Sequence, residues 1–192
     1  MTGSPRPAGS LPPLTLVIGG ARSGKSRHAE ALVAATGLPR TYIATAEAWD
    51  DEMRARIAQH RTDRGAGWQT VEAPQDLAPA LCAVPAGRVV LVDCLTLWLT
   101  RQLMPLSNDL EQNRPPAHDW PAQAAMFLKA IEACPGPIVL VGNEIGLGVI
   151  PLGREVRAFV DALGVLNQQV AAACERVTLM AAGLPLCLKG AS

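Results

Sequence analysis

The residue types and spacing best suited to chemistry lie near the start of the chain, in the segment Gly19-Gly20-Ala21-Arg22-Ser23-Gly24-Lys25-Ser26. This segment matches the pattern G-x-x-x-x-G-K-[ST], in which backbone N–H groups cradle phosphate oxygens. Lys25 would add positive charge at the outer phosphates, and Ser26 would offer its hydroxyl to Mg²⁺. An apolar run over residues 14–18 precedes the segment and a helical pattern follows it, which is the context of a P-loop. The sequence therefore predicts a site for a nucleoside triphosphate.

A carboxylate at the end of a second apolar run is the candidate partner for that metal ion. The run Arg88-Val89-Val90-Leu91-Val92 is typical of a buried strand, and Asp93 follows it. Mg²⁺ on a triphosphate needs an acidic contact at the end of a neighbouring strand, so Ser26 and Asp93 are the predicted metal contacts. The alternative is that Asp93 caps the helix that begins near Leu95. We favour the metal role because a P-loop requires such a group.

The elements that must position these residues alternate between strand and helix. Short strands are predicted at 14–18, 41–45, 69–72, 88–92, 138–141, 177–180 and 186–188, and most of these segments are rich in apolar residues. Helical patterns cover residues 25–36, 51–64, 76–84, 95–103, 122–134 and 153–174. This alternation predicts a mostly parallel sheet covered on both faces, with ligands at the carboxyl ends of the strands. The last two strands flank Gly183 and predict an antiparallel hairpin at the edge of the sheet.

Length and composition limit the domain organisation. A chain of 192 residues favours one domain. Residues 1–13 are rich in Pro, Gly and Ser and predict a flexible leader, so the catalytic domain is expected over residues 14–192. The polar, Pro-rich stretch 105–121 predicts a long loop, which in a compact domain is usually functional or mobile.

Charge and cysteine usage narrow the partners and the compartment. Lys and Arg number 17, as do Asp and Glu, so no excess of positive charge favours nucleic acid. No apolar run is long enough for a membrane span. The five cysteines are odd in number and form no CxxC pair, which favours a reducing cytoplasm over a disulfide framework or a zinc site.

Beyond the P-loop, the sequence resembles the bifunctional adenosylcobinamide kinase / adenosylcobinamide-phosphate guanylyltransferase family of cobalamin biosynthesis. The segments that carry the resemblance are Gly19 through Glu30, Tyr42-Ile43-Ala44-Thr45-Ala46, Asp51-Glu52-Met53 through Arg56-Ile57 to His60-Arg61, Val141 through Pro151, and Gly164 with Asn167-Gln168. They lie in order and span almost the whole chain past residue 14. The Asn-Glu-x-Gly-x-Gly segment that begins at Asn143 is far more specific than the P-loop alone.

The resemblance implies a P-loop NTPase fold of the RecA-like, three-layer type and two reactions. ATP or GTP phosphorylates the aminopropanol hydroxyl of adenosylcobinamide. GMP then passes from GTP to adenosylcobinamide phosphate through a GMP-histidine intermediate, and the family's histidine corresponds to His60. The family also implies a symmetric homotrimer. The nucleotide contacts that it implies, besides the P-loop, are Ala44, Thr45, Ala46, Arg61, Thr62, Asp63, Arg64, Glu72 and Asp93.

The residues themselves are compatible with that role for His60. It shares a helix face with Met53 and Ile57, at i−7 and i−3, which we expect to pack inward. A neutral imidazole can attack an α-phosphate and split one transfer into two easier steps. The alternative is a surface histidine near a helix C-terminus, where the dipole favours it.

Two other functions remain open at this stage. One is a P-loop kinase with a single activity towards another small metabolite, and the other is an NTP-switched binding protein. The chain also departs from the family at three places: Arg101 stands where Asn is usual, and Val160 and Val165 stand where Arg is frequent. These departures bear on substrate or subunit contacts more than on the nucleotide site.

Overall fold

The computed structural model describes residues 11–48, 50–104 and 119–190, apart from the side chains of Arg56 and Asp63. Its seven strands form one sheet in the order β3-β2-β4-β5-β1-β6-β7. The strands are β1 (Leu14–Gly19), β2 (Arg40–Ala44), β3 (Trp68–Glu72), β4 (Val89–Asp93), β5 (Ile138–Asn143), β6 (Arg176–Ala181) and β7 (Leu184–Lys189). The first six pair in parallel, and β7 pairs antiparallel with β6. The predicted fold and its edge hairpin are confirmed.

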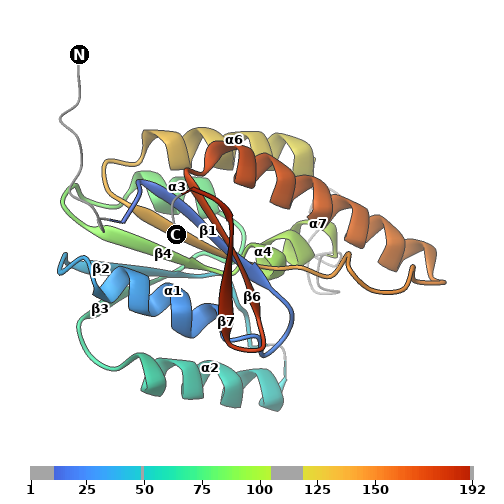
Figure 1. Ribbon diagram of the computed structural model, residues 1–192, viewed down its shortest axis with the longest axis horizontal. Coiled ribbons are helices and arrows are strands. Elements are labelled where there is room, and N and C mark those ends of the chain that lie inside the picture. The colour runs from blue at the N-terminus through green and yellow to red at the C-terminus, as the bar shows by residue number, and fades with distance from the viewer. Residues whose placement is uncertain (1–10, 49, 105–118, 191–192) are drawn as a thin grey trace, which may run out of the picture.

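Helices cover both faces of the sheet, as Figure 1 shows. They are α1 (Lys25–Ala34), α2 (Asp51–Arg64), α3 (Leu77–Cys82), α4 (Leu95–Leu103), α6 (Trp120–Ala133) and α7 (Arg154–Ala173). Successive residues of a strand point to opposite faces, so Val17 packs under α1 while Leu16 joins the core beneath the other helices. The core that contains Leu16 is the larger of the two. It includes Trp98 and Phe127, whose ring centroids lie 5.4 Å apart.

Helix α2 is the exception to this packing. Its bounds are as predicted, and the Asp50 carboxylate caps it by accepting from the Met53 N–H at 2.7 Å. None of its described side chains is buried, and Figure 1 shows the helix beyond α1, away from the core of the sheet. The expectation that Met53 and Ile57 pack inward was therefore wrong: both are half-buried and line a pocket instead.

Two of the predicted segments are described only in part. Residues 1–10 of the predicted leader lie outside the described residues, but Leu11 packs against the core and the Ile138 N–H donates to the Pro13 carbonyl at 2.7 Å. Of the predicted loop 105–121, residues 105–118 lie outside the described residues, whereas Trp120 already opens α6 after the capping residue Asp119. None of the described helices is both long and apolar enough to cross a lipid bilayer.

Candidate functional site

The P-loop is the tight turn between β1 and α1. Gly24 precedes α1 with a φ of 89°, a left-handed conformation that glycine adopts without strain, and Arg22 adopts a φ of 56°. The turn places the N-terminus of a ten-residue helix at the carboxyl end of β1, where its N–H groups favour an anion. The Lys25 ammonium donates to the Gly20 carbonyl at 3.1 Å, folded back over the loop.

The C-terminal hairpin, β6 and β7, packs against the P-loop and holds it in place. A Cβ on Gly19 would lie 2.5 Å from the Met180 carbonyl oxygen and 2.7 Å from the Ser23 hydroxyl, so only glycine fits there. The Gly183 N–H, in the turn between β6 and β7, donates to the Ser23 carbonyl at 3.1 Å. Backbone packing and hydrogen bonding therefore fix the loop before any nucleotide arrives.

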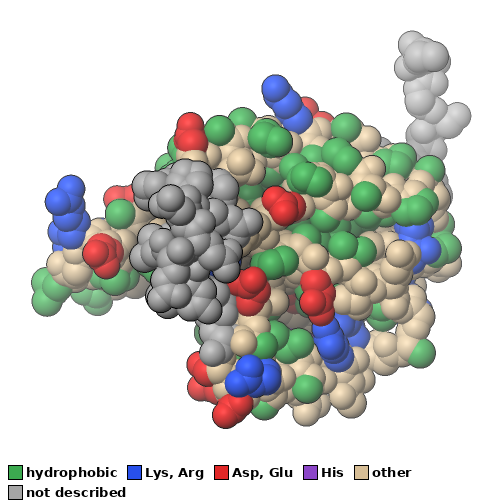
Figure 2. All heavy atoms as spheres, turned by 180° about the vertical axis from the view of Figure 1, so that it is seen from behind, with side chains coloured by type: hydrophobic (Ala, Val, Ile, Leu, Met, Phe, Trp, Pro, Cys, Tyr) green, Lys and Arg blue, Asp and Glu red, His purple; other side chains and the backbone are tan. Residues whose placement is uncertain are grey.

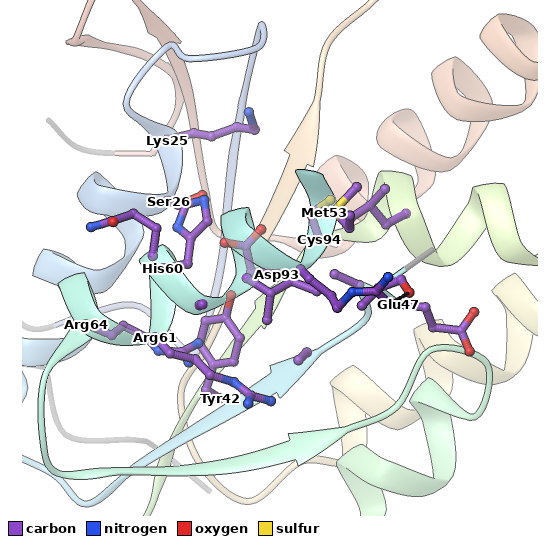
Figure 3. Close-up of a pocket in the computed structure, with 18 of the residues that line it drawn as sticks. Lys25, Ser26, Tyr42, Glu47, Met53, His60, Arg61, Arg64, Asp93 and Cys94 are labelled. Atoms are coloured by element: carbon purple, nitrogen blue, oxygen red, sulfur yellow. Dashed lines mark hydrogen bonds between the residues drawn. The ribbon is translucent and has the colours of Figure 1, made fainter. Parts of the chain in front are cut away.

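A large pocket opens between the P-loop and α2, as Figure 3 shows. Its volume of about 1360 Å³ exceeds the roughly 300–1,000 Å³ of most small-ligand pockets, which leaves space beside a nucleotide for part of a second substrate. The predicted site residues that line it are Ala21, Arg22, Ser23, Gly24, Lys25, Ser26, Ala44, Ala46, His60, Arg61, Arg64, Glu72 and Asp93.

The other predicted site residues lie elsewhere. Gly19 and Gly20 form the base of the loop and are not among the residues that line the pocket. The Thr45 hydroxyl is buried, where it donates to the Cys94 carbonyl at 2.7 Å and accepts from the Cys94 N–H at 2.8 Å. The Thr62 hydroxyl donates to the Ala58 carbonyl of its own helix at 3.1 Å. The side chain of Asp63 lies outside the described residues.

Asp93 lines the pocket, but its strand does not occupy the predicted position in the sheet. Strand β5 lies between β1 and β4, so β1 and β4 are not adjacent. The expectation that Asp93 would follow a strand next to the one that leads into the P-loop was wrong. Asn143, at the end of β5, lines the pocket between the P-loop and Asp93. Helix α4 is preceded by Cys94, so Asp93 is the last residue of β4 and does not occupy the capping position. The capping alternative is therefore not supported.

Two ionisable side chains at the pocket wall are held in their neutral forms. Burial, with the nearby charge of Asp93, raises the pKa of Tyr42 well above its usual value. The same two causes raise the pKa of the Cys94 thiol to about 12. A thiol with that pKa is inert as a nucleophile near neutral pH. These two side chains are thus poor candidates for covalent chemistry near neutral pH.

Charged contacts hold the C-terminal half of α2 over this wall. The Arg61 guanidinium donates to a Glu72 carboxylate oxygen at 2.5 Å, which ties α2 to the end of β3. The Arg64 guanidinium lies 3.4 Å from the centroid of the Tyr42 ring, a cation–π contact to β2. Figure 3 shows His60 extending from the same helix towards the P-loop. Both arginines predicted to meet the triphosphate thus engage protein groups in this conformation.

The pocket also contains residues that were not assigned to the site from the sequence, among them Tyr42, Glu47, Met53, Ile57 and Asn143. Tyr42 and Asn143 lie at or near the carboxyl ends of β2 and β5, and knowledge of the strand order would have indicated them. Met53 and Ile57 share a helix face with His60, so the spacing was recognised but its environment was misassigned. Glu47 lies in the link between β2 and α2 and carried no signal of its own.

Comparison with known proteins gives consistent matches. Residues 15–188 match the family model described as cobinamide kinase / cobinamide phosphate guanyltransferase. The chain is 52% identical over 176 residues to the bifunctional adenosylcobalamin biosynthesis protein CobP of Pseudomonas aeruginosa, covering 91% of this chain and 96% of that one. It is 40% identical over 186 residues to the protein CobU of Escherichia coli, covering 92% and 99% of the two chains.

Solved structures of distant proteins share the fold alone. A Pyrococcus horikoshii protein superposes with a TM-score of 0.51 at 8% identity, covering 95% of this chain and 88% of that one. An ATPase from a type III secretion system of pathogenic bacteria gives a TM-score of 0.50 at 12% identity, covering 89% and 53% of the two chains. At these low identities, the likenesses concern the fold alone.

The fit around Gly19 generates the first prediction. Gly19→Ala should weaken binding of a nucleoside triphosphate, because relief of the clash with Met180 must move the loop at a cost of about 1–3 kcal/mol. Gly20→Ala is the matched comparison, since a Cβ there meets nothing within 4 Å. Isothermal titration with a non-hydrolysable GTP analogue should show the larger loss for Gly19→Ala. Equal losses would contradict this account of the loop.

Proposed function

This chain belongs to the cobinamide kinase / cobinamide phosphate guanyltransferase family, and we propose that its two reactions share the pocket between the P-loop and α2. It is a bifunctional enzyme of adenosylcobalamin biosynthesis, which phosphorylates adenosylcobinamide and transfers GMP to the phosphorylated product. The observation that carries the proposal is that Lys25 and His60 line the same pocket from opposite elements. A single-activity kinase or an NTP-switched binding protein is not supported, because the relatives are named as bifunctional enzymes.

The kinase step uses the P-loop. The hydroxyl oxygen of adenosylcobinamide attacks the γ-phosphorus of ATP or GTP, and the bond from that phosphorus to the β,γ-bridging oxygen breaks. The nucleoside diphosphate leaves with the electron pair, and the hydroxyl proton passes to water or to a pocket carboxylate. Lys25 and the N–H groups of the loop stabilise the charge that develops on the transferred group.

Guanylyl transfer uses the same triphosphate at another bond. An imidazole nitrogen of His60 attacks the α-phosphorus of GTP, and the bond to the α,β-bridging oxygen breaks as pyrophosphate leaves. A phosphate oxygen of adenosylcobinamide phosphate then attacks the same phosphorus, and the phosphorus–nitrogen bond returns its electron pair to His60. The P-loop holds the leaving pyrophosphate in this reaction, whereas it presents the transferred group in the other.

Selection of guanine is assigned to Glu72. Its carboxylate could accept from the N1–H and N2–H₂ groups of guanine, and adenine offers no equivalent pair of donors. Glu72 now pairs with Arg61, so guanine would have to displace that contact. The displaced Arg61, with Arg64, could then neutralise phosphate charge, as the family resemblance implies.

A divalent metal fits the donor set of the pocket, and Mg²⁺ is the ion proposed. Ser26 and Asp93 both line the pocket and supply the hydroxyl and carboxylate oxygens that this hard cation prefers. The described residues contain no cluster of three or more acidic, His or Cys side chains, which agrees with an ion held mainly by phosphates and water. Bound there, the ion would neutralise negative charge on the phosphates.

The role of Asp93 is tested through the metal dependence. Asp93→Asn should raise the Mg²⁺ concentration needed for half-maximal rate by about tenfold or more in both reactions, because a charged ligand is lost. Asp161→Asn removes a similar charge from the exposed surface of α7 and serves as the control. Rates measured across a Mg²⁺ titration decide the matter, and an unchanged midpoint for Asp93→Asn would remove it from the metal site.

The role of His60 is tested by trapping the intermediate. Incubation with GTP labelled at the α-phosphate should leave acid-labile, base-stable label on the chain, as expected for a phosphorus–nitrogen bond. His60→Ala should lose this label and still phosphorylate adenosylcobinamide, because the P-loop is untouched. His28→Ala is the control, since that imidazole lies on α1 and is not among the pocket residues. Label that survives in His60→Ala would overturn the proposed nucleophile.

The proposal includes a homotrimer, as the family resemblance implies. The segment between β5 and α7 supports an assembly, because Leu147, Val149, Ile150 and Leu152 are 81%, 96%, 78% and 98% exposed. Figure 2 shows hydrophobic side chains gathered where this segment projects from the body, at the left edge of the view. Exposed apolar groups in such a cluster are typical of protein interfaces.

The assembly is tested with a charged double variant. Val149→Asp with Leu152→Asp should shift the sedimentation coefficient from that of a trimer to that of a monomer, because buried carboxylates oppose association. Leu38→Asp, a matched change at a less exposed apolar position before β2, should leave the trimer intact. A wild-type chain that sediments as a monomer would refute the assembly itself.

Two expectations remain as predictions. They are the division into a leader, 1–13, and one catalytic domain, 14–192, and the cytoplasmic location. Limited proteolysis tests the first, and cell fractionation tests the second.

A further inference from the structure

The helix that carries His60 lacks the apolar packing that normally fixes a helix in place. No described side chain of α2 is buried, so its position depends on polar contacts and on the segments at its two ends. At the C-terminal half, Arg61 and Arg64 contact Glu72 and Tyr42. At the N-terminal end, a short link connects β2 to α2, and its first residue, Thr45, is held by the backbone of Cys94.

The link is also anchored by a buried arginine. The Arg101 side chain on α4 is only 6% exposed, and its Nε lies 3.1 Å from a carboxylate oxygen of Glu47, whose side chain is 29% exposed. Glu47 belongs to the link and lines the pocket. A guanidinium this deeply desolvated needs its partners, because an unpaired buried charge is strongly destabilising. The pair therefore holds Glu47 against α4.

Neighbouring residues of α4 extend this anchor to the segment after β3. The Gln75 carbonyl accepts from Trp98 Nε1 at 3.0 Å and from Gln102 Nε2 at 3.2 Å. In the amide orientation that satisfies both groups, the Gln75 side-chain oxygen accepts from Arg101 Nη2 at 2.7 Å. Helix α4 thus ties together the segments that follow β2 and β3, on either side of α2 in the chain.

We propose that Arg101 is a positioning residue for guanylyl transfer, which acts through Glu47 to set the approach of α2, and so of His60, to the P-loop. The inference rests on the proposed role of His60. A displacement of the nucleophile by about 1 Å can cost about 100-fold in rate. The kinase step is less dependent on Arg101, because the P-loop is braced by the hairpin turn at Gly183.

The experiment compares Arg101→Met and Glu47→Gln with a matched control. Arg88→Met also removes a partly buried arginine, but its guanidinium donates to the Thr41 hydroxyl and the Arg40 carbonyl at the amino end of β2, away from the pocket, both at 2.7 Å. Three quantities are measured for each full-length variant: phosphorylation of adenosylcobinamide, α-phosphate label on the chain, and hydrogen exchange of the amides of α2.

Arg101→Met should slow labelling by about tenfold or more and phosphorylation by less than about threefold, because only the nucleophile is displaced. Amide exchange should rise in α2 but not in α1. Glu47→Gln should also slow labelling and raise amide exchange in α2. The double variant should be no more impaired in labelling than Arg101→Met, since the two residues act through one contact. Arg88→Met should slow the two reactions to the same extent, if at all.

Several outcomes would overturn the inference. One is an equal loss of both activities in Arg101→Met, and another is unchanged amide exchange of α2. If Arg101→Met does not fold, Glu47→Gln decides alone, and unaltered labelling in that variant refutes the role. The proposed function fails separately: label that persists in His60→Ala removes the nucleophile, while faster exchange of α2 in Arg101→Met would still establish the anchor.

Discussion

The turn from β1 into α1 is the constraint on which the rest of the molecule depends. Gly19 has no room for a Cβ between the Met180 carbonyl and the Ser23 hydroxyl, and the hairpin turn at Gly183 donates to the carbonyl of Ser23. These backbone contacts preorganise the phosphate site, so the cost of ordering the loop falls on folding and not on the binding of nucleotide. Which reaction occurs then depends on which group approaches the bound triphosphate, the hydroxyl of adenosylcobinamide or the imidazole of His60.

The two walls of the pocket are built on different physical principles. The P-loop wall is packed into a sheet and is fixed. The α2 wall has no described buried side chain, and it is held by an ion pair at Glu72, a cation–π contact at Tyr42 and the Arg101–Glu47 anchor. A wall held by polar contacts can adjust more readily than one held by close packing. That difference suits a site where one substrate, adenosylcobinamide, returns as its phosphate for the second reaction.

The sequence predicted most of the fold, because most of the strands are short apolar runs and each helix has a clear pattern or end signal. The bounds of α2 and α4 were correct. The order of the strands was not accessible, since it depends on long-range pairing, and so the placement of β5 and Asn143 between the P-loop and Asp93 was missed. Glu47 and Arg101 were missed as partners for a similar reason: they are 54 positions apart and meet only through the fold. The inward packing expected for Met53 and Ile57 failed because helical spacing identifies a shared face but not what that face contacts.

The central claim is that one triphosphate site serves both transfers. The most direct test is to compare inhibition of the two reactions by a non-hydrolysable ATP analogue, together with the number of triphosphates bound per chain by equilibrium dialysis. The account predicts one bound triphosphate per chain, and competitive inhibition of phosphorylation and of His60 labelling with the same inhibition constant. Two bound triphosphates per chain, or labelling that resists the analogue while phosphorylation is blocked, would contradict it.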